Sequence, residues 1–428
     1  MKKIIPLLMI GFCACTFFVS SCSKNTDAPA PAQGLVVNAL SAVTVHYGDV
    51  LTINGSNFNT TAANNTVTIN GVPAPVLAVS AAAITVSVPA VGNTSGEVLI
   101  KSGSATANGG TVTYVPDVYV AGYENNAANI SVARYWKNGT PVALGTTGLP
   151  SAARSVVVNG SDVYVAGYEN NANGKAVAKY WKNGKAVELG DGATNTLAVS
   201  VFVSGNDVYT AGHELVPVNN TTVALAKYWK NGTPVTLGSA GTASFARSIV
   251  VNGNDVYVAG YENNANGKNV AKYWKNGNPV TLSDGTNTTY AQAIAVNNND
   301  VYVAGYELYS NGSSTLRCWK NGTAVQSETG NTAAFGLFVK GNDMYCAGLE
   351  VVNNKNIAKY WKNGTATTLS DASLVFTATS IATFGNDIYV SGIEGGGAGN
   401  RSVYWKNGTQ TNITDGTKAS QSWGIYVR

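Results

Sequence analysis

Residues 162–184 read DVYVAGYENNANGKAVAKYWKNG, and close variants of this stretch recur along the rest of the chain. Each copy opens on an Asp, and the next copy follows 43 to 48 residues later. Each also ends on a segment such as YWKNG, whose Trp recurs at a similar spacing. A period of this length indicates one supersecondary unit repeated along the chain. The opening residues are Asp117, Asp162, Asp207, Asp255, Asp300, Asp343 and Asp387, and the tryptophans are Trp136, Trp181, Trp229, Trp274, Trp319, Trp361 and Trp405.

Every unit has the pattern of four short strands. In the second unit we expect them at residues 155–158, 163–168, 176–182 and 186–189. An Asn-Gly-Ser-Asp turn links the first strand to the second, and Lys-Asn-Gly links the third to the fourth. Asn-Gly favours a type I′ hairpin turn, because both central residues of that turn need a positive φ. Four strands at a period near 45 residues predict a β-propeller.

The two ends of the repeat region complement each other. The chain finishes on SWGIYV at residues 422–427, which has the pattern of a first strand with no second strand after it. The unit that begins at Asp117 has the other three strands but lacks a first strand. We therefore predict an all-β fold in which residues 117–428 form a seven-bladed propeller and the C-terminal strand completes blade one. Such closure removes the open sheet edges that invite aggregation.

A separate segment, residues 34–115, precedes the repeats and reads as strands and turns. Its sequence includes GDVLTINGSNF (48–58), NTVTINGVPAPVLAVSAAAITVSVPA (65–90) and GGTVTYVP (109–116). This order resembles the IPT/TIG family of immunoglobulin-like domains. The resemblance implies a β-sandwich, of a kind that often serves as a spacer or an interaction module beside a working domain. It carries over no functional residues.

The first residues predict export and lipid attachment. Residues 1–21 combine a basic start with an apolar stretch, as in a secretory signal peptide. The following Val-Ser-Ser-Cys resembles a bacterial lipobox, which implies that Cys22 is lipidated and that residues 22–33 form a tether. The alternative is ordinary signal cleavage with Cys22 incidental. Ser23 after the cysteine, by resemblance to Gram-negative lipoproteins, favours the outer membrane, and leaves open whether the protein is at the cell surface.

Composition excludes some classes of function. The formal charge is +4, and two of the positive residues, Lys2 and Lys3, lie in the predicted leader. The remainder is nearly neutral, which excludes nucleic-acid binding through a general basic field. Two His and five Cys in the whole chain leave little for metal or nucleophile chemistry, so we expect no cofactor and no metal site. After the leader and Cys22, two cysteines remain, Cys318 and Cys346, and we favour two buried thiols over a disulfide.

The links between strands predict where a ligand binds. Turns between first and second strands and between third and fourth strands are nearly constant, whereas the remaining loops vary, from ENNANGK to EGGGAGN. Variable loops on a constant scaffold favour recognition. Eight residues before each repeated Asp, the first strand should reach the mouth of the central channel. With Trp423 of the closing strand, those residues are Arg154, Val199, Arg247, Gln292, Phe335 and Thr379.

From this ring we predict ligand contacts by Arg154, Arg247, Gln292, Phe335 and Trp423. Aromatic rings stack on the apolar faces of sugars, and polar groups bond their hydroxyls, so this mixture suits a glycan. A small residue follows each ring position, as a crowded axis requires. The alternative is that the ring residues simply fill the channel.

The residues that repeat in every unit have simpler interpretations. We expect the tryptophans to pack between blades, and the repeated Asp to bond local backbone at a turn. A Glu ends each second strand, where it can either pair with a Lys or Arg across the hairpin or bind a cation or polar ligand; we favour the ion pair. These residues are Glu124, Glu169, Glu214, Glu262, Glu307, Glu350 and Glu394.

Catalysis has little support in the sequence. Four Asp in loops between units, at 191, 284, 371 and 415, include Asp-Gly turn signals, and no Ser/His/Asp arrangement can be built. We therefore predict a monomeric, non-catalytic, lipid-anchored binding protein of the cell envelope, with a glycan as its ligand. The alternatives are a scaffold or adhesin that binds an envelope protein, and a polysaccharide-degrading enzyme that uses the loop aspartates.

Overall fold

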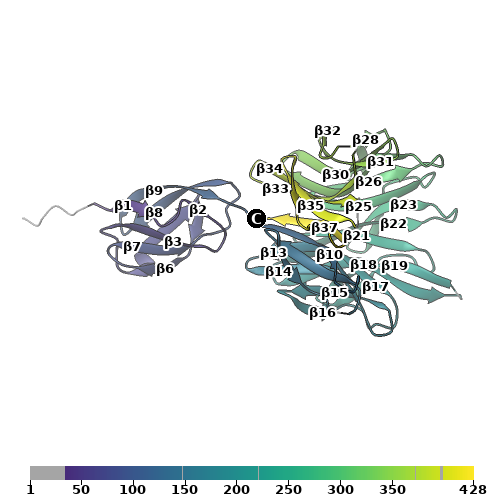
Figure 1. The fold of residues 1–428 in the computed structure, drawn as a ribbon, viewed down its shortest axis with the longest axis horizontal. Helices are drawn as coiled ribbons and strands as arrows, with labels where there is room; N and C mark the ends of the chain where they lie inside the picture. The colour runs from purple at the N-terminus through teal and green to yellow at the C-terminus, as the bar shows by residue number, and fades with distance from the viewer. Residues whose placement is uncertain (1–33, 147, 220, 372, 396–398) are drawn as a thin grey trace, which may run out of the picture.

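A computed structural model describes residues 34–428 apart from 147, 220, 372 and 396–398. The predicted signal peptide, the lipidated Cys22 and the tether therefore lie outside the described residues. Figure 1 shows a small β-sandwich beside a larger ring of sheets. In the part of the chain just defined, there is no helix long and apolar enough to cross a membrane.

The sandwich consists of two sheets that enclose an apolar core. One sheet has the order β1-β3-β7-β6, and the other the order β2-β9-β8-β4-β5, with β2 parallel to β9. Residues along β8 alternate strictly between exposed and buried, as expected for a strand with one face on the core. The elements are β1 (Val36–Leu40), β2 (Thr44–Val45), β3 (Val50–Ser56), a 3₁₀ turn (Ala62–Asn64), β4 (Asn65–Ile69), β5 (Val72–Ala74), β6 (Val76–Val79), β7 (Ala83–Ser87), β8 (Ser95–Ser102) and β9 (Ala105–Tyr114).

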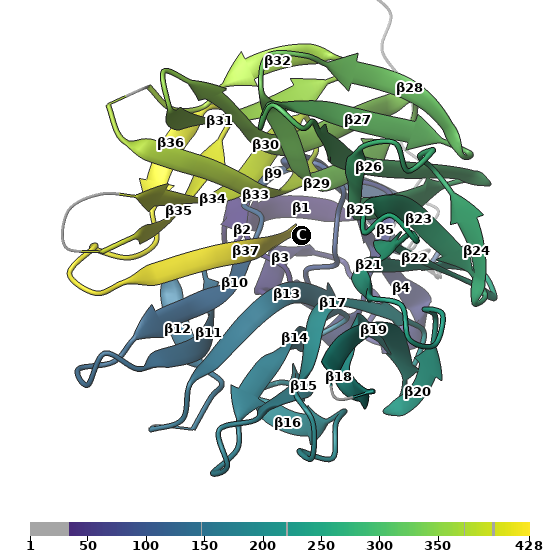
Figure 2. The same ribbon diagram turned by 90° about the vertical axis from the view of Figure 1, so that its right-hand side faces the viewer.

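The ring consists of seven four-stranded antiparallel sheets around a common centre (Figure 2), which confirms the seven-bladed propeller. We call the strands of each blade a to d, from the centre outward. Blade 1 is β37 (Ser420–Val427), β10 (Val118–Asn125), β11 (Ser131–Lys137) and β12 (Thr140–Ala143); blade 2 is β13 (Ser151–Asn159), β14 (Asp162–Asn170), β15 (Ala176–Lys182) and β16 (Lys185–Glu188); blade 3 is β17 (Thr196–Ser204), β18 (Asp207–Val218), β19 (Thr221–Lys230) and β20 (Thr233–Thr236); blade 4 is β21 (Ser244–Asn252), β22 (Asp255–Asn263), β23 (Asn269–Lys275) and β24 (Asn278–Thr281).

The remaining three blades follow the same plan. Blade 5 is β25 (Thr288–Asn297), β26 (Asp300–Leu308), β27 (Ser314–Lys320) and β28 (Thr323–Glu328); blade 6 is β29 (Thr332–Lys340), β30 (Asp343–Val352), β31 (Lys355–Lys362) and β32 (Thr365–Thr368); blade 7 is β33 (Val375–Phe384), β34 (Asp387–Gly395), β35 (Arg401–Lys406) and β36 (Thr409–Asn412). Strand β37, at the C-terminus, pairs antiparallel with β10, so the last strand completes blade 1 as predicted.

The repeated c–d turn has the expected geometry, but the repeated Asp has other partners than we expected. In blade 2 the central residues of the c–d turn, Asn183 and Gly184, have φ values of 51° and 81°, as a type I′ turn requires. The carboxylate of Asp162 does not bond local backbone. It accepts a hydrogen bond from Nδ2 of Asn183 at 2.7 Å and pairs with Nζ of Lys182 at 2.7 Å. The Asp thus ties the a–b turn to the c–d turn of its own blade.

The repeated tryptophans pack between blades, as predicted. Trp181 of blade 2 is 1% exposed and shares a cluster with Tyr119 and Ala121 of blade 1. Trp136 of blade 1 packs in the same way against Tyr389 of blade 7, so the closing interface resembles the others. Large aromatic side chains bury much apolar surface, so these rings stabilise the contacts between neighbouring blades.

The sandwich contacts the end of the propeller that carries the a–b turns. Tyr114 stacks on Phe384 with ring centroids 5.5 Å apart, and the guanidinium of Arg428 lies 4.1 Å from the ring centroid of Tyr47. His46 Nδ1 lies 3.6 Å from the carboxylate of Asp117, which is 2% exposed. The b–c and d–a loops therefore lie on the opposite face, which Figure 2 presents to the viewer.

Candidate functional site

Each strand a carries a β-bulge, and the bulged residue is the ring position identified in the sequence. In blade 2, Ala153 pairs with Gly167 and Ser155 pairs with Ala166, so Arg154 has no partner on β14. A bulge leaves its extra residue unpaired and turns that side chain away from the sheet. The seven bulged residues are Arg154, Val199, Arg247, Gln292, Phe335, Thr379 and Trp423.

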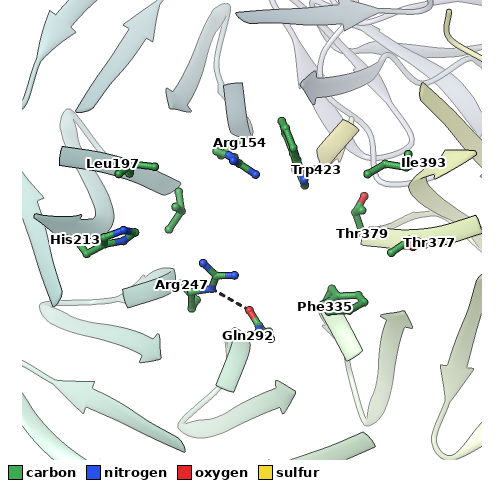
Figure 3. A pocket seen from close by; sticks show the side chains of 11 residues that line it. Arg154, Leu197, His213, Arg247, Gln292, Phe335, Thr377, Thr379, Ile393 and Trp423 are labelled. Carbon is green, nitrogen blue, oxygen red and sulfur yellow. Dashed lines mark hydrogen bonds between the residues drawn. The ribbon is translucent and has the colours of Figure 1, made fainter. Parts of the chain in front are cut away.

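All seven bulged residues line one pocket of about 450 Å³ at the centre of the propeller. The structure thus brings together every residue that we predicted to contact a ligand. In Figure 3 their side chains surround a common opening, with the guanidinium groups of Arg154 and Arg247 directed toward its centre. Four further residues complete the lining: Leu197, His213, Thr377 and Ile393.

The small residue after each bulge is required by close packing at the axis. A Cβ atom on Gly336 would lie 2.7 Å from Cα of Ser380, closer than real contacts allow. Where the small residue is Ser155, its hydroxyl accepts a hydrogen bond from the backbone N–H of Val201 in the next blade, at 3.3 Å. Neighbouring strands therefore fix the backbone beneath the pocket, and a bulged side chain projects from a rigid support.

One side of the pocket is formed by Arg154 and Trp423. The Arg154 guanidinium lies 3.7 Å from the centroid of the Trp423 ring. The ring of Tyr123 also packs against Trp423, with the two ring centroids 5.4 Å apart. Nε of Arg154 is buried without a hydrogen-bond partner among the described residues. Burial is the main cause that lowers the pKa of Arg154, and the positive charge of Arg247 contributes to it.

The opposite side is formed by Arg247 and Gln292. Nε of Arg247 donates a hydrogen bond to Oε1 of Gln292 at 3.0 Å, drawn as a dashed line in Figure 3. This bond orients the amide and leaves the terminal nitrogens of Arg247 available to a ligand. Phe335 lies beside Gln292 and adds an apolar face to the same side.

An arc of aromatic rings, which the sequence analysis missed, supports this side of the pocket. Consecutive ring centroids along the arc lie between 4.7 and 6.0 Å apart. The signal was present in the sequence, because two members are the Tyr of a GYE segment, at 261 and 306, and two lie two places before a bulge, at 245 and 290. The members are His213, Phe245, Tyr261, Tyr290, Tyr306 and Phe335.

His213 stands where most blades have Tyr, and its environment keeps it uncharged. Burial, together with the positive charges of Arg247 and Arg154, lowers the pKa of His213 to about 4. Its Nδ1 is buried without a hydrogen-bond partner within the described residues. At neutral pH the pocket therefore carries the charges of two arginines and a neutral imidazole.

A second hollow adjoins the pocket between blades 1 and 2. This groove of about 510 Å³ shares Arg154 and Trp423 with the pocket and continues past Tyr123, Tyr168 and Pro150. Two of the five predicted ligand residues thus lie where the hollows meet. The pocket and the groove thus form two adjoining hollows that share one wall.

The repeated glutamates pair with Lys or Arg in all seven blades, which agrees with the favoured interpretation. In blade 2, Glu169 pairs with Nζ of Lys179 at 2.7 Å and also accepts a hydrogen bond from the backbone of Thr146 in the preceding loop. These carboxylates are thus occupied by structural contacts. The pairs are Glu124–Arg134, Glu169–Lys179, Glu214–Lys227, Glu262–Lys272, Glu307–Arg317, Glu350–Lys359 and Glu394–Arg401.

The loop aspartates also have local roles. Oδ1 of Asp191, Asp284, Asp371 and Asp415 each accepts a hydrogen bond from the backbone N–H two residues later. Among the described residues that line the pocket, none is Asp or Glu. The described part of the chain also lacks any group of three or more His, Cys, Asp or Glu that could hold a metal ion.

Cys318 and Cys346 are free thiols in adjacent blades. Both are buried, and their Sγ atoms lie 3.2 Å apart. The hydrogen bond to Cys346, together with burial, raises the pKa of Cys318. The pair belongs to the interface between blades 5 and 6 and is not among the described residues that line the pocket.

Comparison with known proteins identifies the first domain. Residues 35–114 match the family model of the IPT/TIG domain, which confirms the resemblance seen in that segment. No match to the chain is found among curated proteins.

Several solved structures are similar to the chain at low identity. A protein of unknown function from Bacteroides thetaiotaomicron is 10% identical with a TM-score of 0.44, covering 92% of this chain and 99% of its own. The β-propeller domain of the Trilobed protease from Pyrococcus furiosus is 11% identical (TM-score 0.41, coverage 80% and 98%). An auxiliary nutrient binding protein from Bacteroides ovatus is 14% identical (TM-score 0.30, coverage 84% and 96%). Every TM-score is below 0.5, so none of the three bears on the function of this chain.

Proposed function

We propose that the protein is a non-catalytic glycan-binding protein of the cell envelope. One observation carries this proposal: seven bulged residues, equivalent in the repeat but different in chemistry, converge on a single pocket. The constant residues around them are occupied in packing or ion pairs. The variable positions are therefore those that a ligand would contact.

The lining has the composition that sugar recognition requires. Trp423 and Phe335 offer aromatic faces, and Arg154, Arg247 and Gln292 offer hydrogen-bond donors. Glycoside hydrolysis uses a pair of carboxyl groups beside the scissile bond, and the described residues of the lining include none. Binding without cleavage is the activity that these side chains support.

The proposed location places this pocket outside the cytoplasm. A lipid on Cys22 would anchor the chain to the outer membrane, and residues 22–33 would act as the tether. The sandwich then lies between the tether and the propeller, and contacts the face opposite the variable loops. This order supports an arrangement in which the pocket points away from the anchor.

The test is affinity electrophoresis of the purified full-length protein in gels that contain polysaccharides, with analysis of each mixture for products. Retardation without breakdown is expected. Replacing Trp423 and Arg247 together by Ala should abolish the retardation, whereas Val325→Ala, at an exposed apolar residue of the outer strand β28, should not change it. Breakdown of a polysaccharide, or no retardation across a broad panel, would refute the proposal; the second result would favour a protein ligand.

A further inference from the structure

The pocket holds two arginines that lack acidic partners. The chain has six arginines, and three of them, Arg134, Arg317 and Arg401, pair with repeated glutamates. A fourth, Arg428, donates hydrogen bonds to the backbone oxygen of Gly160 and to the hydroxyl of Tyr119. The two that remain, Arg154 and Arg247, form no ion pair within the described residues, and both project into the pocket.

Two unpaired guanidinium groups in one pocket are costly without a counter-charge. A partly buried charge loses hydration that only an opposite charge or several hydrogen bonds can replace. Nε of Arg154 has no hydrogen-bond partner among the described residues, and the described lining offers no carboxylate to either arginine. The two positive charges also repel each other, and this repulsion, after burial, contributes to the lowered pKa of Arg154.

The neighbouring contacts hold both groups in place for a ligand. The Trp423 ring packs on one face of the Arg154 guanidinium at 3.7 Å, and this leaves its edge as the hydrogen-bonding surface. The bond from Nε of Arg247 to Gln292 fixes the plane of the second guanidinium. An oriented guanidinium fork matches the two oxygens of a carboxylate or sulfate, and such charge-assisted bonds are about twice as strong as neutral ones.

We propose that the pocket selects an anionic sugar unit, whose carboxylate or sulfate is bound between Arg154 and Arg247. This inference rests on the proposed glycan-binding function and specifies its ligand class. The aromatic surfaces of Trp423 and Phe335 bind the sugar ring, and the groove between blades 1 and 2 takes the adjoining unit of the chain. A neutral sugar would use the aromatic surfaces but would leave both positive charges unmatched.

The test uses matched pairs of oligosaccharides that differ only in charge. One pair is oligogalacturonate and the same oligomer with its carboxyl groups reduced to alcohols; a second is a sulfated galactan oligomer and its desulfated form. Calorimetry with the purified full-length protein should show at least tenfold tighter binding of the charged member of one pair. The pair that responds identifies carboxylate or sulfate as the recognised group.

Variants separate a pocket contact from general electrostatics. Arg154→Gln and Arg247→Gln should each reduce affinity for the charged oligomer to near that of its neutral partner. The control is Lys185→Gln, which removes one positive charge from the exposed c–d hairpin of blade 2, on the face opposite the pocket, and should leave affinity unchanged. Equal loss in all three variants would overturn the assignment.

The outcomes also separate this inference from the proposed function. If neutral oligomers or neutral polysaccharides bind as tightly as charged ones, the protein is a glycan binder and the anionic assignment is wrong. If no charged oligomer binds but neutral polysaccharides retard the protein, the assignment is again wrong. If no glycan of either kind binds, both proposals fail.

Discussion

The guanidinium of Arg154 lies 3.7 Å from the ring centroid of Trp423, and the two residues come from strands about 270 positions apart in the sequence. Arg154 belongs to β13 of blade 2, and Trp423 to β37, the strand that closes blade 1. The stack therefore forms only when the ring is closed. It joins the closure of the fold to the assembly of the proposed binding surface.

Replacement by Ala should mainly reduce ligand affinity at one tryptophan and mainly reduce stability at another. Trp423→Ala removes a half-buried ring at the pocket, so we expect at least a tenfold loss of glycan affinity and about 1 kcal/mol of unfolding free energy. Trp229→Ala removes a ring that is 1% exposed between blades, which should cost about 4 kcal/mol. Affinity electrophoresis and urea unfolding of both variants measure this contrast. A Trp423→Ala protein that binds normally would remove this residue from the site.

Stability should depend on pH through His213. Its pKa is about 4 in the folded protein and near 6.5 when unfolded, so the unfolded chain takes up a proton first as pH falls. Stability is therefore complete above pH 6.5 and declines between pH 6.5 and 4. Between pH 7 and pH 5 the wild type should lose about 2 kcal/mol more than His213→Tyr, which carries the residue of most other blades. Urea unfolding at both pH values measures this. An equal change in unfolding free energy between pH 7 and pH 5 for the two proteins would contradict the prediction.

The two families of repeated ion pairs should differ in importance. Glu169 and Lys179 are 6% and 11% exposed. Glu169→Gln leaves the buried ammonium with only the exposed Glu188, at 3.3 Å, as an acidic partner among the described residues, and should cost about 2 kcal/mol. The side chain of Asp162 is 32% exposed, and in Asp162→Asn an amide oxygen still accepts from Asn183, so we expect much less change. Chemical denaturation of the two variants at pH 7 tests the difference; equal losses would show that burial does not set the contribution.

The contribution of the Glu169–Lys179 pair to folding stability should decrease as pH falls. Burial works to raise the pKa of Glu169, but the hydrogen bonds from Lys179 and Thr146 outweigh it and hold that pKa below its usual value. The pair therefore stabilises the fold above the pKa of an unfolded Glu, and its contribution is lost as pH falls below that value. Glu169→Gln should lose less stability than the wild type on acidification. An unchanged pH dependence would argue against the pair.

The two thiols should be reduced and unreactive in the native protein. The pKa of Cys318 is raised, and both side chains are buried, so the reactive thiolate is scarce. We expect no alkylation of Cys318 or Cys346 by iodoacetamide in buffer, and alkylation of both in guanidinium chloride without reductant. Peptide mass spectrometry measures both states. Failure to alkylate the unfolded chain until reductant is added would reveal a disulfide.

The features that could be predicted from the sequence are those that recur at equivalent positions in every repeat. The Asn-Gly turns at seven equivalent places specify hairpins, and the unmatched strand at residues 422–427 specifies closure. The ring of pocket residues could be predicted for the same reason, because equivalent positions in a closed repeat meet at the axis. Packing of the tryptophans between blades follows from their size.

The bulge and its consequences could not be read from the pattern. Strand a of blade 2 begins at Ser151, four residues before the expected start at 155, because pairing continues beyond the bulge at Arg154. The shift in register also brings Leu197, two residues before the bulged Val199, into the pocket wall, together with His213, its pairing partner on β18; this is why both were missed. Bulges depend on the adjoining strands and leave little trace in one segment.

The contact between sandwich and propeller was also not predictable. It depends on Phe384, which stands where blade 2 has Asn159, and on Tyr114, far away in the sequence. An apolar residue at a position that is polar in another blade indicates a contact, but the sequence does not identify the distant residue that makes it. The tie of the repeated Asp to a second turn was missed for a similar reason, since the partner Asn lies on another hairpin.

The bulge has a consequence for how specificity evolves. A residue outside the hydrogen-bonded ladder and the inter-blade core can mutate with little penalty to folding, so selection can act on its chemistry alone. The architecture thus provides seven equivalent bulged positions, one for each blade, and a single-codon change can replace the residue at any one of them independently. Duplication of a blade would also copy its bulged residue, and the copy could then diverge toward a new ligand.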